Sequence, residues 1–112
     1  MTKSIHNSEH YTWGQNCDGW HLLKGETLSV IQERMPSESS EKLHFHEKSQ
    51  QLFFILSGTA TFEIEGEEFL VKAHESIHIK PGLKHKIKNM NKADLHFLVI
   101  SEPKAHGDRI NC

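Results

Sequence analysis

The stretch Glu41-Lys42-Leu43-His44-Phe45-His46-Glu47-Lys48-Ser49-Gln50-Gln51 is the most informative part of this sequence. On a β-strand successive side chains point to opposite faces, so His44 and His46 share one face and Phe45 points the other way. Such a pair alone is more often a surface or packing feature than half of a metal site. A third histidine, His85, follows the Pro81-Gly82 turn farther along the chain. Together the three histidines favour a metal site.

The two blocks resemble the paired motifs of the cupin superfamily. The first motif corresponds to four residues, with glutamine where the family usually has glutamate: His44, His46, Gln51 and Gly58. In the second motif His74-Glu75 stands where the family usually opens with Gly-Asp, and the matching residues are Pro81, Gly82, His85 and Asn89. The resemblance covers residues 28 to 101. It implies an all-β fold, the cupin double-stranded β-helix or jelly-roll barrel.

The hydrophobic pattern agrees with that fold, because apolar residues alternate with a period of two and no window has a sustained helical period. Short strands of near-regular spacing indicate a β-sandwich or barrel. We expect strands over residues 28–35, 42–46, 51–56, 59–65, 69–71, 76–79, 84–89 and 95–101. The strand over 51–56 is apolar on both faces, which predicts that a second sheet or a partner subunit covers its outer side.

The chain is expected to form a single cupin domain, since 112 residues leave room for one core. Within it, residues 1–20 are predicted to be an N-terminal arm, either a short helix or a segment laid across a neighbouring subunit. Residues 21–101 would form the barrel and 102–112 a C-terminal tail on the surface. In that tail, Asp108 and Arg109 are interpreted as a surface ion pair.

Composition bears on partners and location. The 13 Lys and Arg residues against 15 Asp and Glu give a net charge of −2, with no basic surplus for nucleic acid or an anionic membrane. No apolar segment is long enough to span a bilayer or to act as a signal peptide. The two cysteines do not suggest a disulfide framework, so a cytoplasmic location is expected.

By the resemblance, His44, His46 and His85 bind a divalent transition metal (Fe, Mn, Ni or Zn), with Gln51 in the fourth position. Three neutral imidazoles suit these ions and leave coordination positions open for water or substrate. Glutamine offers a neutral amide oxygen, so the site lacks one negative charge, or Gln51 hydrogen-bonds a metal-bound water instead. Glu47 is a weaker candidate for a replacement carboxylate. The alternative is a degenerate cupin whose histidines only fill a polar pocket.

Two functions follow. The first is a metal-dependent enzyme, most plausibly a dioxygenase-like one, acting on a small organic substrate in a pocket with apolar walls. Five side chains are expected to line that pocket: Phe53, Ile55, Phe62, Ile87 and Phe97. The alternative is a non-catalytic cupin that binds a sugar or carboxylate, because the matched positions contain no obvious general base.

A homodimer is also expected, because one apolar row lies opposite the Gln51 face and soluble monomers usually avoid such exposed patches. The row consists of Leu52, Phe54 and Leu56. The competing account is that the N-terminal segment, with Trp13 and Trp20, covers this row within one chain.

Overall fold

The computed structural model describes residues 1–112 and consists of eleven β-strands. In chain order they are β1 (Glu9–Trp13), β2 (Cys17–Lys24), β3 (Ser29–Met35), β4 (His44–His46), β5 (Gln50–Ser57), β6 (Thr59–Ile64), β7 (Glu67–Lys72), β8 (Ser76–Ile79), β9 (His85–Lys88), β10 (Leu95–Glu102) and β11 (Arg109–Asn111). All eight strands expected from the sequence are present, with bounds that differ by a few residues. The structure contains no helix that is long and apolar enough to cross a membrane.

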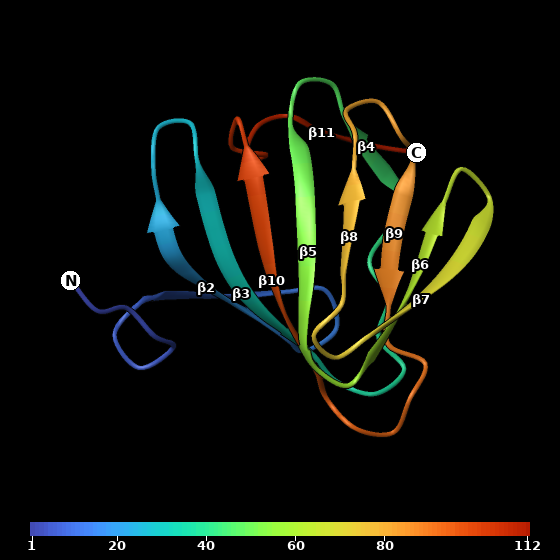
Figure 1. The fold of residues 1–112 in the computed structure, drawn as a ribbon, viewed down its shortest axis with the longest axis horizontal. Helices are drawn as coiled ribbons and strands as arrows, with labels where there is room; N and C mark the ends of the chain where they lie inside the picture. The colour runs from blue at the N-terminus through green and yellow to red at the C-terminus, as the bar shows by residue number, and fades with distance from the viewer.

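The strands form two antiparallel sheets, and this is the cupin double-stranded β-helix expected from the sequence. The six-stranded sheet has the order β1-β2-β3-β10-β5-β8, and the five-stranded sheet has the order β11-β4-β9-β6-β7. Figure 1 shows the strands of the two sheets side by side around one interior, with the C-terminus beside β4 and β9. The histidine strand β4 therefore lies in the smaller sheet, and Gln51 lies in the larger one.

The core lies between the sheets and follows the strand alternation. On β5 the buried residues are Gln51, Phe53 and Ile55, and the residues between them are only half-buried. The inner face of β10 continues this layer. From the smaller sheet, Phe62 and Ile87 are fully buried against it. The same inner faces also carry the site residues, so the core fixes their positions.

Gly58 makes the turn from β5 to β6, as its place in the first motif suggests. Its φ is 87°, in the left-handed region that glycine adopts without strain. A Cβ atom here would lie 3.0 Å from the Asp94 carbonyl oxygen. The close approach of the chain and the positive φ both require glycine at this position.

The prediction that residues 1–20 form an N-terminal arm was wrong. Residues 9–13 and 17–24 form β1 and β2, which pair with each other, and β2 pairs with β3. These strands extend the larger sheet sideways and do not cover the row around Phe54. Trp20 pairs with Gln32, Gln32 with Leu98, and Leu98 with Phe54, so the four residues form one line across the sheet. Trp20 therefore lies on the same outer face as Phe54, beside the apolar row and not over it. The competing account, in which the N-terminal segment covers the apolar row within one chain, is therefore wrong for β1 and β2.

The C-terminal tail expected for residues 102–112 lies largely on the surface, but part of it forms a strand. Residues Arg109–Asn111 form β11, which pairs antiparallel with β4. In this register Arg109 lies opposite His46 and Asn111 opposite His44. The C-terminal segment is thus hydrogen-bonded along the strand that carries two of the three histidines.

Candidate metal centre and pocket

Three histidines meet between neighbouring strands of the smaller sheet. His44 and His46 lie on β4, and His85 on β9 lies directly opposite His44 in the strand register. The ring centroids of His44 and His85 are 4.4 Å apart, and those of His44 and His46 are 5.0 Å apart. One nitrogen from each ring lies within 4.8 Å of the others, and all three side chains are buried. The strand parity that suggested the site has brought these residues together.

Each of the three imidazoles is held by a backbone carbonyl at Nδ1. His44 Nδ1 lies 2.8 Å from the Lys42 carbonyl oxygen, and His85 Nδ1 lies 2.8 Å from that of Leu83. His46 Nδ1 lies 3.3 Å from the carbonyl oxygen of Asp108. A carbonyl only accepts, so the proton sits on Nδ1 and the lone pair is on Nε2. This is the arrangement that orients a metal-binding histidine.

The electrostatics of the cluster favour neutral imidazoles. Burial lowers the pKa of all three histidines, and it lowers the pKa of His44 to about 3. The Nε2 atoms of His46 and His85 are buried and have no hydrogen-bond partner in the chain. Buried polar atoms without partners are uncommon and need an explanation. Three neutral nitrogen donors with free lone pairs fit a divalent transition metal.

Gln51 approaches the site from the opposite sheet, on the inner face of β5. Its amide nitrogen donates a hydrogen bond to Ser101 Oγ at 3.0 Å. This bond fixes the orientation of the amide and leaves Oε1 buried without a partner. The carbonyl oxygen of Gln51 is therefore an unused acceptor, as a fourth ligand or a partner for bound water would need.

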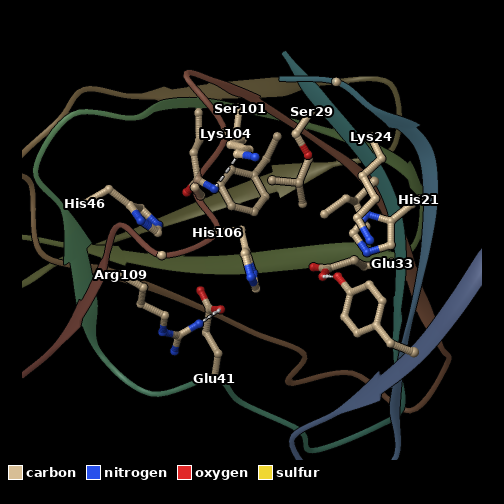
Figure 2. Close-up of a pocket in the computed structure, with 18 of the residues that line it drawn as sticks. His21, Lys24, Ser29, Glu33, Glu41, His46, Ser101, Lys104, His106 and Arg109 are labelled. Atoms are coloured by element: carbon tan, nitrogen blue, oxygen red, sulfur yellow. Dashed lines mark hydrogen bonds and ion pairs between the residues drawn. The ribbon is translucent and has the colours of Figure 1, made fainter. Parts of the chain in front are cut away.

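The cluster opens into a cavity of about 500 Å³ between the sheets. Its apolar wall comes from the larger sheet and includes Ile31, Phe53 and Val99. Figure 2 shows His46 and Arg109 at one end of the cavity, Glu33 and His21 at the other, and His106 between them. Ligand-binding pockets in proteins are typically about 300–1,000 Å³. The cavity is therefore large enough for a small organic molecule beside the histidines.

Two partly buried carboxyl groups line this cavity. Burial and the neighbouring Glu33 carboxyl together raise the pKa of Glu41 to about 8, although the charge of Arg109 opposes the shift. Burial also raises the pKa of Glu33 to about 7. Arg109 Nη1 lies 3.8 Å from Glu41, and the Tyr11 hydroxyl donates a 2.8 Å hydrogen bond to Glu33. Both acids therefore change protonation near neutral pH.

The family model of the cupin domain matches residues 30–101 of this chain. The chain belongs to the cupin family. An uncharacterized protein from Methanocaldococcus jannaschii is 32% identical to this cupin over 83 residues, which are 74% of this chain and 66% of that protein. An oxalate-binding protein from Thermotoga maritima is 31% identical over 85 residues, which are 71% of this chain and 70% of that protein.

Solved structures agree with the fold of this cupin. The crystal structure of a predicted oxalate decarboxylase from Thermotoga maritima superposes with a TM-score of 0.81 at 23% identity, covering 93% of this chain and all of that one. An RmlC-like cupin from Shewanella frigidimarina superposes with a TM-score of 0.84 at 13% identity, covering 94% of this chain and 92% of that one. At these identities the likeness shows the shared fold.

The structure corrects the predicted pocket wall of the cupin. Phe53 lines the cavity as expected. The other four predicted residues fill the hydrophobic core away from the cavity: Ile55, Phe62, Ile87 and Phe97. Strand parity places all five on inner faces, but only one end of the interior is hollow, and parity does not say which end. Glu47, the weaker ligand candidate, is exposed and lies outside the histidine cluster.

The interpretation of Asp108 and Arg109 as a surface ion pair was wrong. Arg109 lines the cavity beside Glu41. The Asp108 carboxylate accepts hydrogen bonds from the backbone N–H groups of Glu47, Lys48 and Ser49 at 3.2, 3.0 and 2.8 Å. These bonds lower the pKa of Asp108. The segment thus holds the loop after β4 and, through the carbonyl of Asp108, the ring of His46.

Sequence reasoning missed Tyr11, Glu33 and Glu41 as site residues. A signal for Glu33 was present, because it alternates with Ile31 and Met35 and so interrupts an apolar face of the predicted strand. No comparable signal marks Tyr11, which lies in a segment that was not recognised as a strand. The position of Glu41 depends on how the loop before β4 folds over the cavity.

Proposed function

We propose that this cupin binds a divalent transition metal through His44, His46 and His85, and that it is a metal-dependent enzyme acting on a small organic anion. The observation that carries the proposal is the convergence of three imidazoles whose Nδ1 atoms are held by carbonyls; two of these imidazoles, those of His44 and His46, line a cavity. When bound, the metal would supply positive charge that orients and polarises an oxygen of the ligand.

The charge of the donor set supports an anionic ligand. Three neutral histidines and the neutral amide of Gln51 leave the charge of a divalent ion unbalanced, and such an ion is the largest local charge in its site. Arg109 and Lys104 add positive charge to the cavity. The name of the Thermotoga relative, an oxalate-binding protein, supports a carboxylate in particular.

Catalysis is favoured over binding alone by the acids in the same cavity. Carboxyl groups whose pKa lies near the working pH are suited to proton transfer, and such groups cluster at active sites. Glu33 and Glu41 both have this property. The dioxygenase-like chemistry expected from the sequence stays a prediction. The alternative, a cupin that binds a carboxylate without turnover, is supported by the oxalate-binding relative.

Calorimetric titration with oxalate as the probe tests the anion site. We expect oxalate to bind the protein loaded with Mn(II) and not the metal-free protein. Arg109→Gln should weaken this binding about tenfold, because a hydrogen bond to a charged group contributes about 1.5 kcal/mol or more. Lys92→Gln, an exposed lysine outside the cavity, is the matched control. Equal binding with and without metal would refute the proposal.

Oxygen consumption by the Fe(II)-loaded protein, screened over small organic acids, tests the oxygenase chemistry separately. Uptake that depends on both the metal and the acid would support it. The absence of uptake with every acid would reject the oxygenase and leave the anion site in place.

A further inference from the structure

The tyrosine–glutamate pair at the far end of the cavity is the feature that the metal centre does not explain. The pair consists of Tyr11 on β1 and Glu33 on β3, with Gly19 of β2 between them. In the strand register Tyr11 lies opposite Gly19, and Gly19 lies opposite Glu33. The Tyr11 hydroxyl nevertheless donates a 2.8 Å hydrogen bond to Glu33 Oε2 across the intervening strand.

Gly19 makes this reach possible. A Cβ atom at this position would overlap the ring and the hydroxyl of Tyr11. The phenol can therefore lie flat across β2 only because residue 19 has no side chain. Three strands thus contribute one residue each to placing a single carboxyl group.

An apolar residue would suit the position of Glu33 better if the position were only structural. Along the same inner row, Glu33 is opposite Phe97, which is opposite Ile55, and both are fully buried. Placing a carboxyl group in such a row costs free energy unless it is hydrogen-bonded. The second oxygen, Oε1, makes no hydrogen bond within the chain, and the residue lines the cavity. The arrangement therefore leaves one carboxyl oxygen available to a ligand.

We propose that Glu33 is a catalytic acid–base group of this cavity and that Tyr11 is its positioning residue, so the reaction moves a proton to or from a small organic anion. The inference rests on the proposed function, because the anion is held at the histidine end. It narrows the reaction class to proton transfer, as in isomerisation, decarboxylation or elimination.

The proton can be followed at Glu33. The acid form gives its O–H proton to a carbon or oxygen of the ligand as negative charge develops there. The carboxylate that remains is stabilised by the O–H of Tyr11. It regains a proton from another position of the ligand, as in isomerisation, or from water, and so the acid is restored.

The groups that face Glu33 set the pH range of this exchange. Burial raises the pKa of Glu33 to about 7, while the hydrogen bond from Tyr11 and the charge of Arg109 oppose the shift. Glu41 faces it from the loop before β4, and Cys17 lies near it on β2. Because these groups leave Glu33 about half protonated near pH 7 and largely protonated below it, it can act there as a proton donor.

Labelling of the metal-free protein with diazoacetamide tests the assignment directly. A protonated carboxyl transfers its proton to the diazo carbon, the carboxylate oxygen then bonds to that carbon, and N₂ leaves. Solvent-exposed carboxylates are ionised near neutral pH, so they react poorly. Mass spectrometry of the digested protein should locate the ester at Glu33. The yield should fall as the pH rises through about 7.

Two variants serve as the test and the control for the labelling experiment. Glu33→Gln should remove the ester at position 33 but not any ester at Glu41, whose raised pKa also keeps it protonated, whereas Glu67→Gln, an exposed residue outside the cavity, should leave the ester at Glu33 unchanged. An ester at Glu41 alone, or no ester in the cavity, would overturn the proposal. Because no metal is present, this outcome is independent of oxalate binding, which tests the proposed function.

The role of Tyr11 has its own readout, the pH midpoint of labelling. Tyr11→Phe removes a donor that stabilises the carboxylate, so the midpoint should move to higher pH. Gly19→Ala keeps the phenol but displaces it, and should produce the same upward shift. An unchanged midpoint in both variants would overturn the positioning role.

Discussion

Replacing Glu33 by Gln should change how the stability of the metal-free protein depends on pH. In the folded protein the pKa of Glu33 is about 7, against 4.5 for an ordinary glutamate. The folded state therefore holds this proton more tightly than the unfolded state does. Its stabilising contribution is complete below pH 4.5 and is lost as the pH rises through about 7. Glutamine does not titrate, so the variant escapes this loss.

The size of the effect follows from the two pKa values. Their difference is about 2.5, and each pKa unit corresponds to about 1.4 kcal/mol, so the complete loss is about 3 kcal/mol. Between about pH 5 and about pH 9, the stability of Glu33→Gln relative to the parent protein should rise by about 2–3 kcal/mol. A shift of this size is a large part of the stability of a small domain.

Urea unfolding of both proteins at these two pH values gives the measurement, with Glu67→Gln as the control for loss of an exposed charge. Comparing the two proteins removes most contributions of groups that they share, including the histidines. A stability difference that is independent of pH would refute the reasoning, because Glu33 would then ionise as readily in the folded chain as in the unfolded chain.

Three further predictions concern the metal centre and the assembly. Gln51→Glu should tighten binding of Mn(II) or Fe(II), since a carboxylate adds a charge where the amide has a dipole, and calorimetry showing equal or weaker affinity would place Gln51 outside the coordination shell. Asp108→Ala should weaken metal binding about 10- to 100-fold, because it frees the loop after β4 and the carbonyl that orients His46; an unchanged affinity in a competition assay would contradict this. The expected homodimer should dissociate when Phe54, half-buried on the outer face opposite Leu98, is replaced by Glu; a monomer mass for the parent protein in light scattering at tens of micromolar would reject the dimer.

The histidine pair on β4 could be predicted from local geometry, and the resemblance to the cupin motifs added His85. Two histidines separated by one residue share a face of any strand, and the Pro-Gly turn places His85 at the start of the neighbouring strand β9. The barrel could be predicted for a related reason, since Phe53 and Ile55 alternate with half-buried residues along β5. The pair on β4 and the inner face of β5 depend only on parity within a strand, whereas His85 meets the pair because β9 pairs with β4.

The residues at the far end of the cavity are brought together by pairing between strands that are distant in sequence. The alternation of side chains within a strand does not say which strands pair. Glu9 and Tyr11 face the cavity and only Trp13 on that face packs against the core, so the segment of β1 shows little apolar alternation and did not resemble a strand. Arg109 reaches the site because the three-residue strand β11 pairs with β4, which lies more than 60 residues earlier in the sequence. The polar residues that β1 and β11 contribute to the site also interrupt the apolar alternation from which a strand is predicted, so the sequence does not indicate these two strands.

The metal content of the purified protein, measured by elemental analysis, tests the central claim most directly. The account predicts about one divalent transition metal ion per chain, as expected for a single three-histidine site, and loss of most of it in a His44→Ala/His46→Ala variant. His6→Ala/His78→Ala, which removes two exposed histidines, should keep the metal. Full metal occupancy in the His44→Ala/His46→Ala variant would contradict the account.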